Sequence, residues 1–199
     1  MTEREWDRYL RIRTIGREDE SNANYSPYEP TPYPVLQRLA DSGHIRHRSR
    51  LLDYGCGKGR VVFFMAGVVG CRATGIDQSG RLIDIAKENR RTARAGDRVR
   101  LVQCLAEQYA PADEDVFFFF NPFSEKVFEG VLRRIARSQA ERPRAVKLCC
   151  YYPSEAYAAA LEAAPEAACV DSIDCGDLFN GRDPRERILV YAFAPPDGA

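Results

Sequence analysis

Short apolar runs and longer amphipathic segments alternate along the chain from Leu51 onward. The runs predict strands, and the segments, in which apolar side chains recur every three or four residues, predict helices. Strands are expected at 51–54, 71–77, 99–104, 115–120, 145–151, 169–173 and 187–193, with helices at 34–41, 60–69, 80–95, 125–138 and 155–164. Because helices separate most successive strands, the pattern predicts an α/β fold with a mostly parallel seven-stranded sheet and helices on both faces. No helix separates the last two strands, which are expected to pair antiparallel.

The first fifty residues follow a different pattern. Residues 1–34 are rich in charge, Asn, Ser, Tyr and Pro, and residues 22–34 (NANYSPYEPTPYP) carry four prolines. Proline restricts its own backbone and that of the preceding residue, so extended or turn conformation is expected throughout this stretch. We therefore predict an N-terminal cap over residues 1–50 and a single α/β domain over residues 51–199.

Charge and hydropathy exclude several classes of protein. The 29 basic and 29 acidic residues cancel, which argues against a nucleic-acid coat or a polybasic membrane binder. The longest apolar stretch, residues 61–71, is too short for the roughly 20 residues that cross a bilayer. The N-terminus shows no secretory signal, so a cytoplasmic location is expected. Arginine clusters at 44–50 and 90–100 are interpreted as solvated surfaces, with phosphate contact as the alternative.

Cysteine and histidine usage gives no sign of metal chemistry. The chain has seven cysteines, an odd number without CxxC spacing, and two histidines. Most of the cysteines lie in apolar runs, which predicts buried reduced thiols and no metal site. Adjacent Cys149 and Cys150 are expected to pack in the core, with a redox role as the alternative.

The strongest chemical signal is the segment LLDYGCGKGR at residues 51–60, where an apolar run enters a glycine loop before a helix. Gly55, Gly57 and Gly59 allow positive φ and let a ligand approach the backbone. The amides at the following helix start attract negative charge. Asp77 ends the next strand, where its oxygens can accept from the two hydroxyls of a ribose, which predicts a nucleoside ligand. The alternative is a tight turn with Asp77 capping a helix.

The spacing of the glycines narrows the choice of nucleoside. Dinucleotide sites use GxGxxG, whereas this chain has GxGxG preceded by Asp53. A carboxylate at that position can accept from the ammonium group of an amino-acid moiety. The alternative is that Asp53 orients the loop through backbone amides.

Together these residues resemble the first motif of class I S-adenosylmethionine-dependent methyltransferases, which is similar to LDxGCGxGR. The resemblance implies a three-layer Rossmann-like sandwich, S-adenosylmethionine as cofactor and methyl transfer as the activity. In such enzymes an acid after strand three often binds the adenine, but here Leu105 stands at that position. The Ala106 amide is expected to reach the ring instead, with Glu107 or Gln108 as alternative substitutes for the acid. The cofactor-binding residues that the resemblance implies are Thr31, Asp53, Gly55, Cys56, Gly57, Gly59, Asp77, Gln78, Ala106 and Asn121.

An Asn-Pro-Phe segment, Asn121 to Phe123, follows the fourth strand. It resembles the (D/N)PP(Y/F) motif of amino methyltransferases, which implies that Asn121 and the Pro122 carbonyl accept from a target NH₂ while Phe123 stacks on the substrate. One proline is missing relative to that motif, which displaces the aromatic ring. The alternative is a helix start, with Asn121 as N-cap and Pro122 as the first helical residue.

These signals lead to one main hypothesis and two alternatives. We expect methyl transfer to an unidentified acceptor, with a slight preference for nitrogen that rests on Asn121, Pro122 and Phe123 as catalytic residues. A small molecule, a protein or a nucleic acid remains open as acceptor, and oligomeric state is not predicted. The loop 176–185 is a candidate substrate wall. The alternatives are a non-catalytic sensor or partner subunit that binds the cofactor, and a nicotinamide oxidoreductase.

Overall fold

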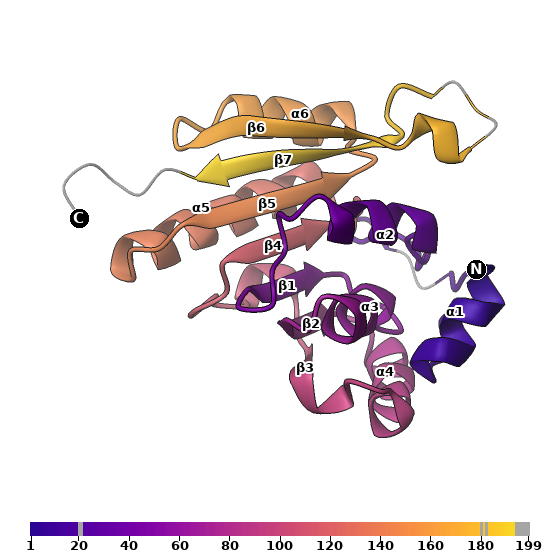
Figure 1. Cartoon of the computed structure of the whole chain (residues 1–199). Coiled ribbons are helices and arrows are strands. Elements are labelled where there is room, and N and C mark those ends of the chain that lie inside the picture. The colour runs from indigo at the N-terminus through magenta and orange to yellow at the C-terminus, as the bar shows by residue number, and fades with distance from the viewer. Residues whose placement is uncertain (20–21, 180, 182, 194–199) are drawn as a thin grey trace.

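A seven-stranded sheet forms the centre of the molecule, with strand order β3-β2-β1-β4-β5-β7-β6 (Figure 1). The computed structural model describes residues 1–19, 22–179, 181 and 183–193. The strands are β1 (Arg50–Tyr54), β2 (Arg72–Asp77), β3 (Val99–Gln103), β4 (Val116–Phe119), β5 (Val146–Tyr151), β6 (Ala167–Asp174) and β7 (Arg187–Phe193). Strands β1 to β5 pair in parallel, and β7 runs antiparallel between β5 and β6. This confirms the predicted mostly parallel sheet and the antiparallel pairing of its last two strands.

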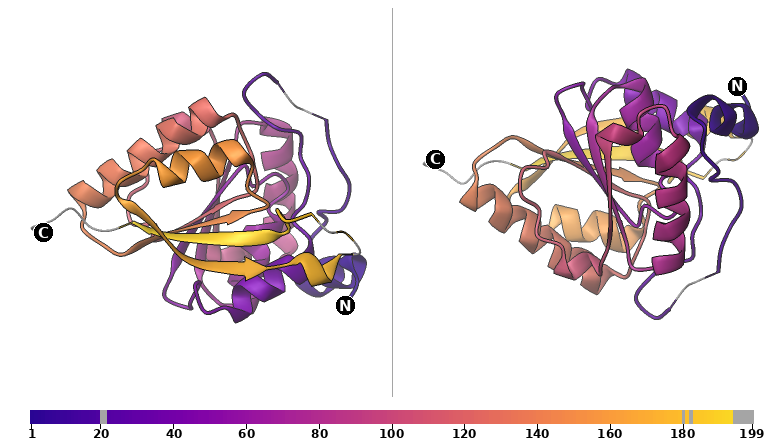
Figure 2. Two further views of the ribbon diagram at one scale, coloured as in Figure 1. Left: turned by 90° about the horizontal axis from the view of Figure 1, so that it is seen from above. Right: turned by 90° about the horizontal axis from the view of Figure 1, so that it is seen from below.

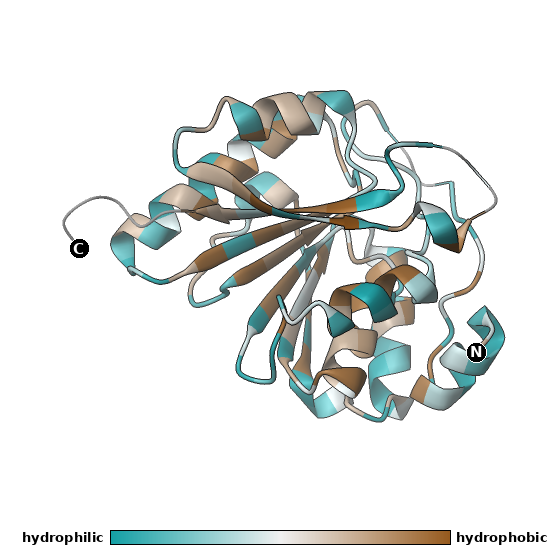
Figure 3. Cartoon of the chain, turned by 45° about the horizontal axis from the view of Figure 1, so that its top comes forward, coloured by the Kyte–Doolittle hydropathy of each residue, from teal (hydrophilic) through white to brown (hydrophobic). Residues whose placement is uncertain are grey.

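Helices cover both faces of the sheet, as Figure 2 shows. They are α1 (Glu3–Leu10), α2 (Tyr33–Asp41), α3 (Arg60–Val68), α4 (Gly80–Thr92), α5 (Glu125–Glu141) and α6 (Glu155–Glu162). One core packs α2 and α3 against the face that carries Leu51 and Phe118, and a second packs α5 and α6 against the face that carries Leu52 and Phe117. Neighbouring residues of a strand thus enter different cores, which is why most positions of the central strands are apolar (Figure 3).

The N-terminal segment departs from the sequence prediction. Extended or turn backbone was expected over residues 1–34, but Glu3–Leu10 forms helix α1. Thr2 and Glu5 form a capping box, a start signal that the charged composition of this segment obscured. The helix has few apolar residues and is held by tertiary contacts, among them Trp6 packed edge-on against Phe64 of α3 with ring centroids 5.0 Å apart. Packing against α3 therefore stabilises a helix that periodicity alone does not predict.

A strap without helix or named strand, comprising residues 22–32, joins this segment to α2 and runs past the carboxyl ends of the parallel strands (Figure 2). It is tied to the loop after β4, because the Ser26 amide donates to the Pro122 carbonyl at 3.0 Å and the Ser124 amide donates to the Asn24 carbonyl at 2.8 Å. The strap therefore lies above the edge of the sheet at which parallel α/β folds bind ligands.

The cysteines are all free thiols, and those at 56, 71, 149, 150 and 175 are buried. Core packing of Cys149 and Cys150 is thus confirmed, and burial raises the pKa of both thiols. Within the described residues, no cluster of three metal-ligating side chains occurs and no helix is long and apolar enough to span a membrane.

Candidate functional site

A cavity of about 510 Å³ lies between the strap and the carboxyl ends of the parallel strands. The strand order reverses between β1 and β4, the position at which α/β sheets open a crevice for ligands. Its volume suits a ligand of cofactor size. The predicted site residues that line it are Thr31, Asp53, Gly55, Cys56, Asp77, Gln78, Ala106, Asn121 and Pro122. Of the other predicted residues, Gly57 and Gly59 complete the loop beside it, and Phe123 lies in the hydrophobic core.

The glycine loop is shaped for close approach of neighbouring segments. Gly55 and Gly57 have φ values of +74° and +51°. A Cβ at Gly55 would lie 2.4 Å from the Pro122 side chain, and one at Gly57 would lie 2.1 Å from the Tyr28 ring. Side chains at these positions would therefore push away the loop after β4 and the strap that together close the cavity.

Asp53 places a carboxylate without a partner at the cavity wall. The residue is 3% exposed, and its Oδ2 atom accepts no hydrogen bond within the described part of the chain. Burial, with a smaller contribution from Asp77, raises the pKa of this carboxyl well above its ordinary value. A buried, unpaired acid of this kind is costly, so it is suited to a cationic ligand group. No backbone amide of the loop satisfies Oδ2, which disfavours the purely structural role for Asp53.

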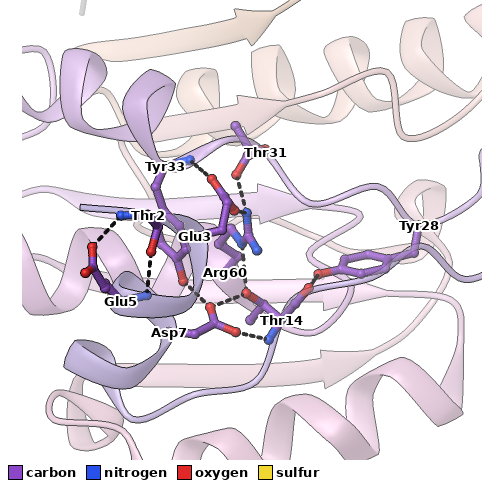
Figure 4. A network of polar contacts seen from close by, with 9 residues as sticks. All are labelled: Thr2, Glu3, Glu5, Asp7, Thr14, Tyr28, Thr31, Tyr33 and Arg60. Carbon is purple, nitrogen blue, oxygen red and sulfur yellow. Dashed lines mark hydrogen bonds and ion pairs between the residues drawn. The ribbon is translucent and has the colours of Figure 1, made fainter.

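Arg60, the first residue of α3, supplies the opposite charge in the same cavity. Its Nε donates to Thr14 Oγ1 at 2.8 Å, and its Nη1 donates to the Thr31 carbonyl at 3.1 Å and to the Glu3 carboxylate (Figure 4). Its Nη2 is buried and has no partner among the described residues. The guanidinium lies 4.3 Å from the centre of the Tyr33 ring. Arg60 can therefore donate further hydrogen bonds to an anionic ligand group.

Arg60 was not among the predicted site residues, although it is the last residue of the glycine-rich segment 51–60. A signal was available, because a cation at the first position of a helix is unfavourable with respect to the helix dipole. Such a residue is retained more readily when an anion neutralises it. Glu3 on α1 is one such anion, and α1 was itself missed.

The N-terminal segment holds Arg60 in place through buried hydrogen bonds (Figure 4). Asp7 accepts from the amide and the hydroxyl of Thr14, both at 2.7 Å, and from the Tyr33 hydroxyl at 2.5 Å. The Tyr28 hydroxyl donates to the Thr14 carbonyl at 2.7 Å. Thr14, fixed in this way, accepts from Arg60, so residues far apart in sequence set the direction of the guanidinium.

Asp77 joins the glycine loop to the start of α4. Its Oδ2 accepts from the Gly57 amide at 2.8 Å and its Oδ1 accepts from the Ser79 amide at 2.9 Å. Next to it, the side-chain oxygen of Gln78 accepts from Asn22 of the strap at 3.2 Å. The carboxylate of Asp77 thus lines the cavity with an orientation fixed by two backbone amides.

Tyr25 of the strap accepts the hydrogen bond of the Ala106 amide, which was expected to reach the adenine. The Ala106 amide donates to the Tyr25 hydroxyl at 2.9 Å, and that hydroxyl donates to the Glu107 carboxylate at 2.6 Å. Burial, together with the bond to Glu107, raises the pKa of Tyr25. Tyr25 lines the cavity as well, so the strap itself fills this part of the site.

The Asn-Pro-Phe segment is engaged in internal contacts. Asn121, with φ of +42°, donates from Nδ2 to the Tyr152 carbonyl at 2.6 Å, and its Oδ1 accepts from the Ser154 amide at 3.1 Å. The Pro122 carbonyl accepts from the strap, and Phe123 is only 4% exposed. The alternative interpretation, with Asn121 as the N-cap of a helix and Pro122 as its first residue, is wrong, because Ser124 is the N-cap of α5. The side chain of Asn121 connects the ends of β4 and β5.

Aromatic side chains enclose the end of the cavity beside β5 and β7. Phe120 and Tyr151 lie with ring centroids 4.8 Å apart, and Tyr152 and Phe179 complete the wall. Glu186 also lines this end and accepts from the Tyr151 hydroxyl at 2.7 Å. The predicted substrate wall at 176–185 contributes Phe179, whereas positions 180 and 182 lie outside the described residues. Neither arginine cluster lines this cavity.

Comparison with known proteins agrees with this geometry. Residues 51–141 match the family model described as methyltransferase domain. An RNA methyltransferase from Salinibacter ruber in complex with S-adenosyl-L-homocysteine is 21% identical, with a TM-score of 0.59 over 86% of this chain and 96% of that one. A TehB-like SAM-dependent methyltransferase from Corynebacterium glutamicum is 21% identical, with a TM-score of 0.58 over 79% of this chain and 86% of that one.

A more distant structure shares the fold as well. The glycopeptide N-methyltransferase MtfA, complexed with S-adenosyl-L-methionine, is 14% identical, with a TM-score of 0.59 over 80% of this chain and 92% of that one. No curated protein matches the chain. Residues 51–141 therefore match a methyltransferase domain, and the chain shares the Rossmann-like fold of solved S-adenosylmethionine-dependent methyltransferases.

Proposed function

We propose that the cavity between the strap and the sheet binds S-adenosylmethionine in an extended form, with its amino-acid end at Asp53 and Arg60. One observation carries this proposal: a buried carboxylate oxygen and a buried guanidinium nitrogen, both without partners in the described residues, line the same cavity. The ammonium and carboxylate of an amino acid satisfy this pair of opposite charges. Charge-assisted hydrogen bonds of this kind are among the stronger ones in proteins.

The positions of β2 and β3 suggest where the ribose and the adenine of the cofactor bind. Asp77 would accept from the ribose hydroxyls, and the Ala106 amide would face the adenine once Tyr25 has released it. Cys56 and Gln78 complete the walls beside the ribose, and Thr31 contributes through the carbonyl that orients Arg60. Residues 1–50 act as the cap, since both the strap and the Arg60 network belong to them.

Bound S-adenosylmethionine supplies a methyl group on a positively charged sulfur. The chain holds the donor at the carboxyl ends of β1 and β4 and lets the acceptor enter beside β5 and β7. Alignment of an acceptor with the methyl group accounts for much of the rate in such a transfer, and no covalent enzyme intermediate is needed. The strap covers the crevice and limits the access of water.

The Asn-Pro-Phe segment gives little support for a nitrogen acceptor in this geometry. The Asn121 amide and the Pro122 carbonyl are engaged with the chain, and Phe123 is buried. Any preference for nitrogen therefore has to come from the aromatic end of the cavity.

Isothermal titration calorimetry tests the proposed cofactor site. Both S-adenosylmethionine and S-adenosylhomocysteine are expected to bind at micromolar concentrations, and NADH is expected not to bind. Asp77→Ala should weaken binding by about tenfold or more, because it removes a charged acceptor that the loop also uses. Unchanged affinity in this variant would exclude Asp77 from the site. Absence of binding by the unmodified chain would overturn the proposed function.

A further inference from the structure

The aromatic end of the cavity, hereafter the acceptor chamber, consists of Phe120, Tyr151, Tyr152, Phe179 and Glu186. These residues follow β4, end β5 or precede β7, so separate parts of the chain converge on one space. The Phe120 ring packs against Tyr151 and lies edge-on to Tyr152, with centroids 6.4 Å apart in the second pair. A carboxylate among aromatic faces is suited to a cationic ligand group.

Glu186 is the charged member of the chamber, and Tyr151 fixes it. The Tyr151 hydroxyl donates to Glu186 at 2.7 Å. Burial, and next the bond to Glu186, raises the pKa of Tyr151, so the phenol remains a hydrogen-bond donor to Glu186. Within residues 1–19, 22–179, 181 and 183–193, Glu186 forms no ion pair.

Two cations near the chamber, Arg185 and Arg38, are paired with other groups. Arg185 bonds Asp183 at 2.6 Å and lies over the Tyr152 ring at 4.4 Å. Arg38 bonds Asp177 and the Asp174 carbonyl. No cation among these competes for Glu186, so the chamber presents an available negative charge to the acceptor.

The change in charge during methyl transfer indicates which kind of acceptor the chamber would stabilise. Positive charge leaves the sulfur and develops on the attacking atom. A carboxylate and aromatic faces beside that atom stabilise a developing ammonium, whereas a carboxylate repels an anionic oxygen nucleophile. We propose that the acceptor is a small amine whose nitrogen lies beside Glu186. This inference rests on the proposed function of the cavity.

The step balances without a further reactant. The amine enters as its ammonium form and loses one proton to water. The nitrogen lone pair then forms the N–C bond while the C–S bond breaks, and the bonding pair stays on sulfur. The products are a methylated ammonium and S-adenosylhomocysteine. Glu186 contacts the reacting nitrogen in this scheme, and Tyr151 acts as a positioning residue for its carboxylate.

Three probes of similar size and different charge test this inference: 2-phenylethylamine, 2-phenylethanol and 3-phenylpropionate. Each is titrated by calorimetry into protein saturated with S-adenosylhomocysteine. The amine is expected to bind about tenfold or more tightly than the other two, because it alone forms a charge pair with the half-buried Glu186. Equal or tighter binding of the alcohol or the acid, or no binding of the amine, overturns the inference. Failure of S-adenosylhomocysteine itself to bind is a different result, which overturns the proposed function.

Variants of Glu186 assign the effect to this residue. Glu186→Gln still accepts from Tyr151 and is expected to lower amine affinity about tenfold while leaving S-adenosylhomocysteine affinity within about twofold. Glu186→Asp keeps the charge and should retain the preference for the amine. Glu162→Gln, the same substitution on the exposed side of α6, is the control and should change neither affinity. An unchanged amine affinity in Glu186→Gln, with a normal melting temperature, contradicts the inference.

Discussion

The hydroxyl of Tyr25 accepts a hydrogen bond from the Ala106 amide at 2.9 Å and donates one to Glu107 at 2.6 Å. A residue of the strap thereby satisfies the backbone donor that the adenine ring is proposed to use. The cofactor must displace this contact on binding, so the strap competes with part of its own ligand.

Tyr25→Phe removes that competition. The variant is expected to bind S-adenosylhomocysteine roughly two- to tenfold more tightly, because a hydrogen bond with a net value of about 0.5–1.5 kcal/mol no longer has to be broken. Calorimetry measures the change. Tyr157→Phe is the matched control, since its buried hydroxyl donates to the Phe123 carbonyl away from the cavity. Weaker binding in Tyr25→Phe alone would mean that the phenol stays in place and contacts the cofactor.

Cofactor binding is expected to release protons because of Asp53. Burial raises the pKa of this carboxyl in the free protein, so it keeps its proton to a higher pH than an exposed acid does. The ammonium of the cofactor lowers that pKa again, and the proton leaves on binding. Affinity should therefore rise with pH up to the raised pKa of the free protein. Calorimetry in buffers of different ionisation enthalpy counts the released protons, and a count of zero at every pH would contradict this role.

The same carboxyl should lower the stability of the free protein. In the unfolded chain Asp53 ionises near pH 4, whereas in the folded chain its raised pKa delays ionisation. Its contribution is therefore most favourable below about pH 4 and declines as the pH rises toward the raised value. Asp53→Asn should melt at a higher temperature than the unmodified chain at alkaline pH, with the gain vanishing in acid, while losing affinity for S-adenosylhomocysteine. A lower melting temperature at alkaline pH would argue against an uncompensated charge.

Arg60 is expected to strengthen the binding only of ligands that carry an amino-acid end. Arg60→Met is expected to weaken the binding of S-adenosylhomocysteine by about tenfold or more, because the variant loses a charge-assisted hydrogen bond to the ligand. Binding of 5′-methylthioadenosine, which has no amino-acid end, should change far less. Glu3→Gln is the control, because it removes the ion pair with α1 and keeps the guanidinium. It should lower the melting temperature and preserve the ratio of the two affinities. Equal losses for both ligands in Arg60→Met would assign the residue to the structure alone.

Asn121 is expected to stabilise the ends of β4 and β5. Asn121→Ala loses two hydrogen bonds and places alanine at φ of +42°, whereas Asn121→Gly loses the same bonds without the backbone strain. Both should unfold more easily in urea, and the alanine variant should be less stable than the glycine variant by about 1 kcal/mol. Equal stability of all three proteins would contradict this role. If S-adenosylhomocysteine affinity is unchanged, the segment contributes to the fold and not to cofactor binding.

The periodicity of the chain was enough to predict the sheet and most of its helices. Apolar runs such as the one before Asn121 are unambiguous, and the spacing of Gly55, Gly57 and Gly59 depends on local backbone geometry. These features are encoded within a few residues. For that reason they could be interpreted without knowledge of distant contacts.

The partners of individual side chains depended on the tertiary structure. Arg60 is an ordinary helix residue until Glu3, Thr14 and the Thr31 carbonyl surround it and leave one buried nitrogen without a partner in the described part of the chain. Helix α1 has too few apolar residues to be predicted by period, because its stability comes from packing on α3. Composition and spacing therefore determined the fold and the class of ligand. The contacts between segments far apart in sequence decided which charges remain available to bind it.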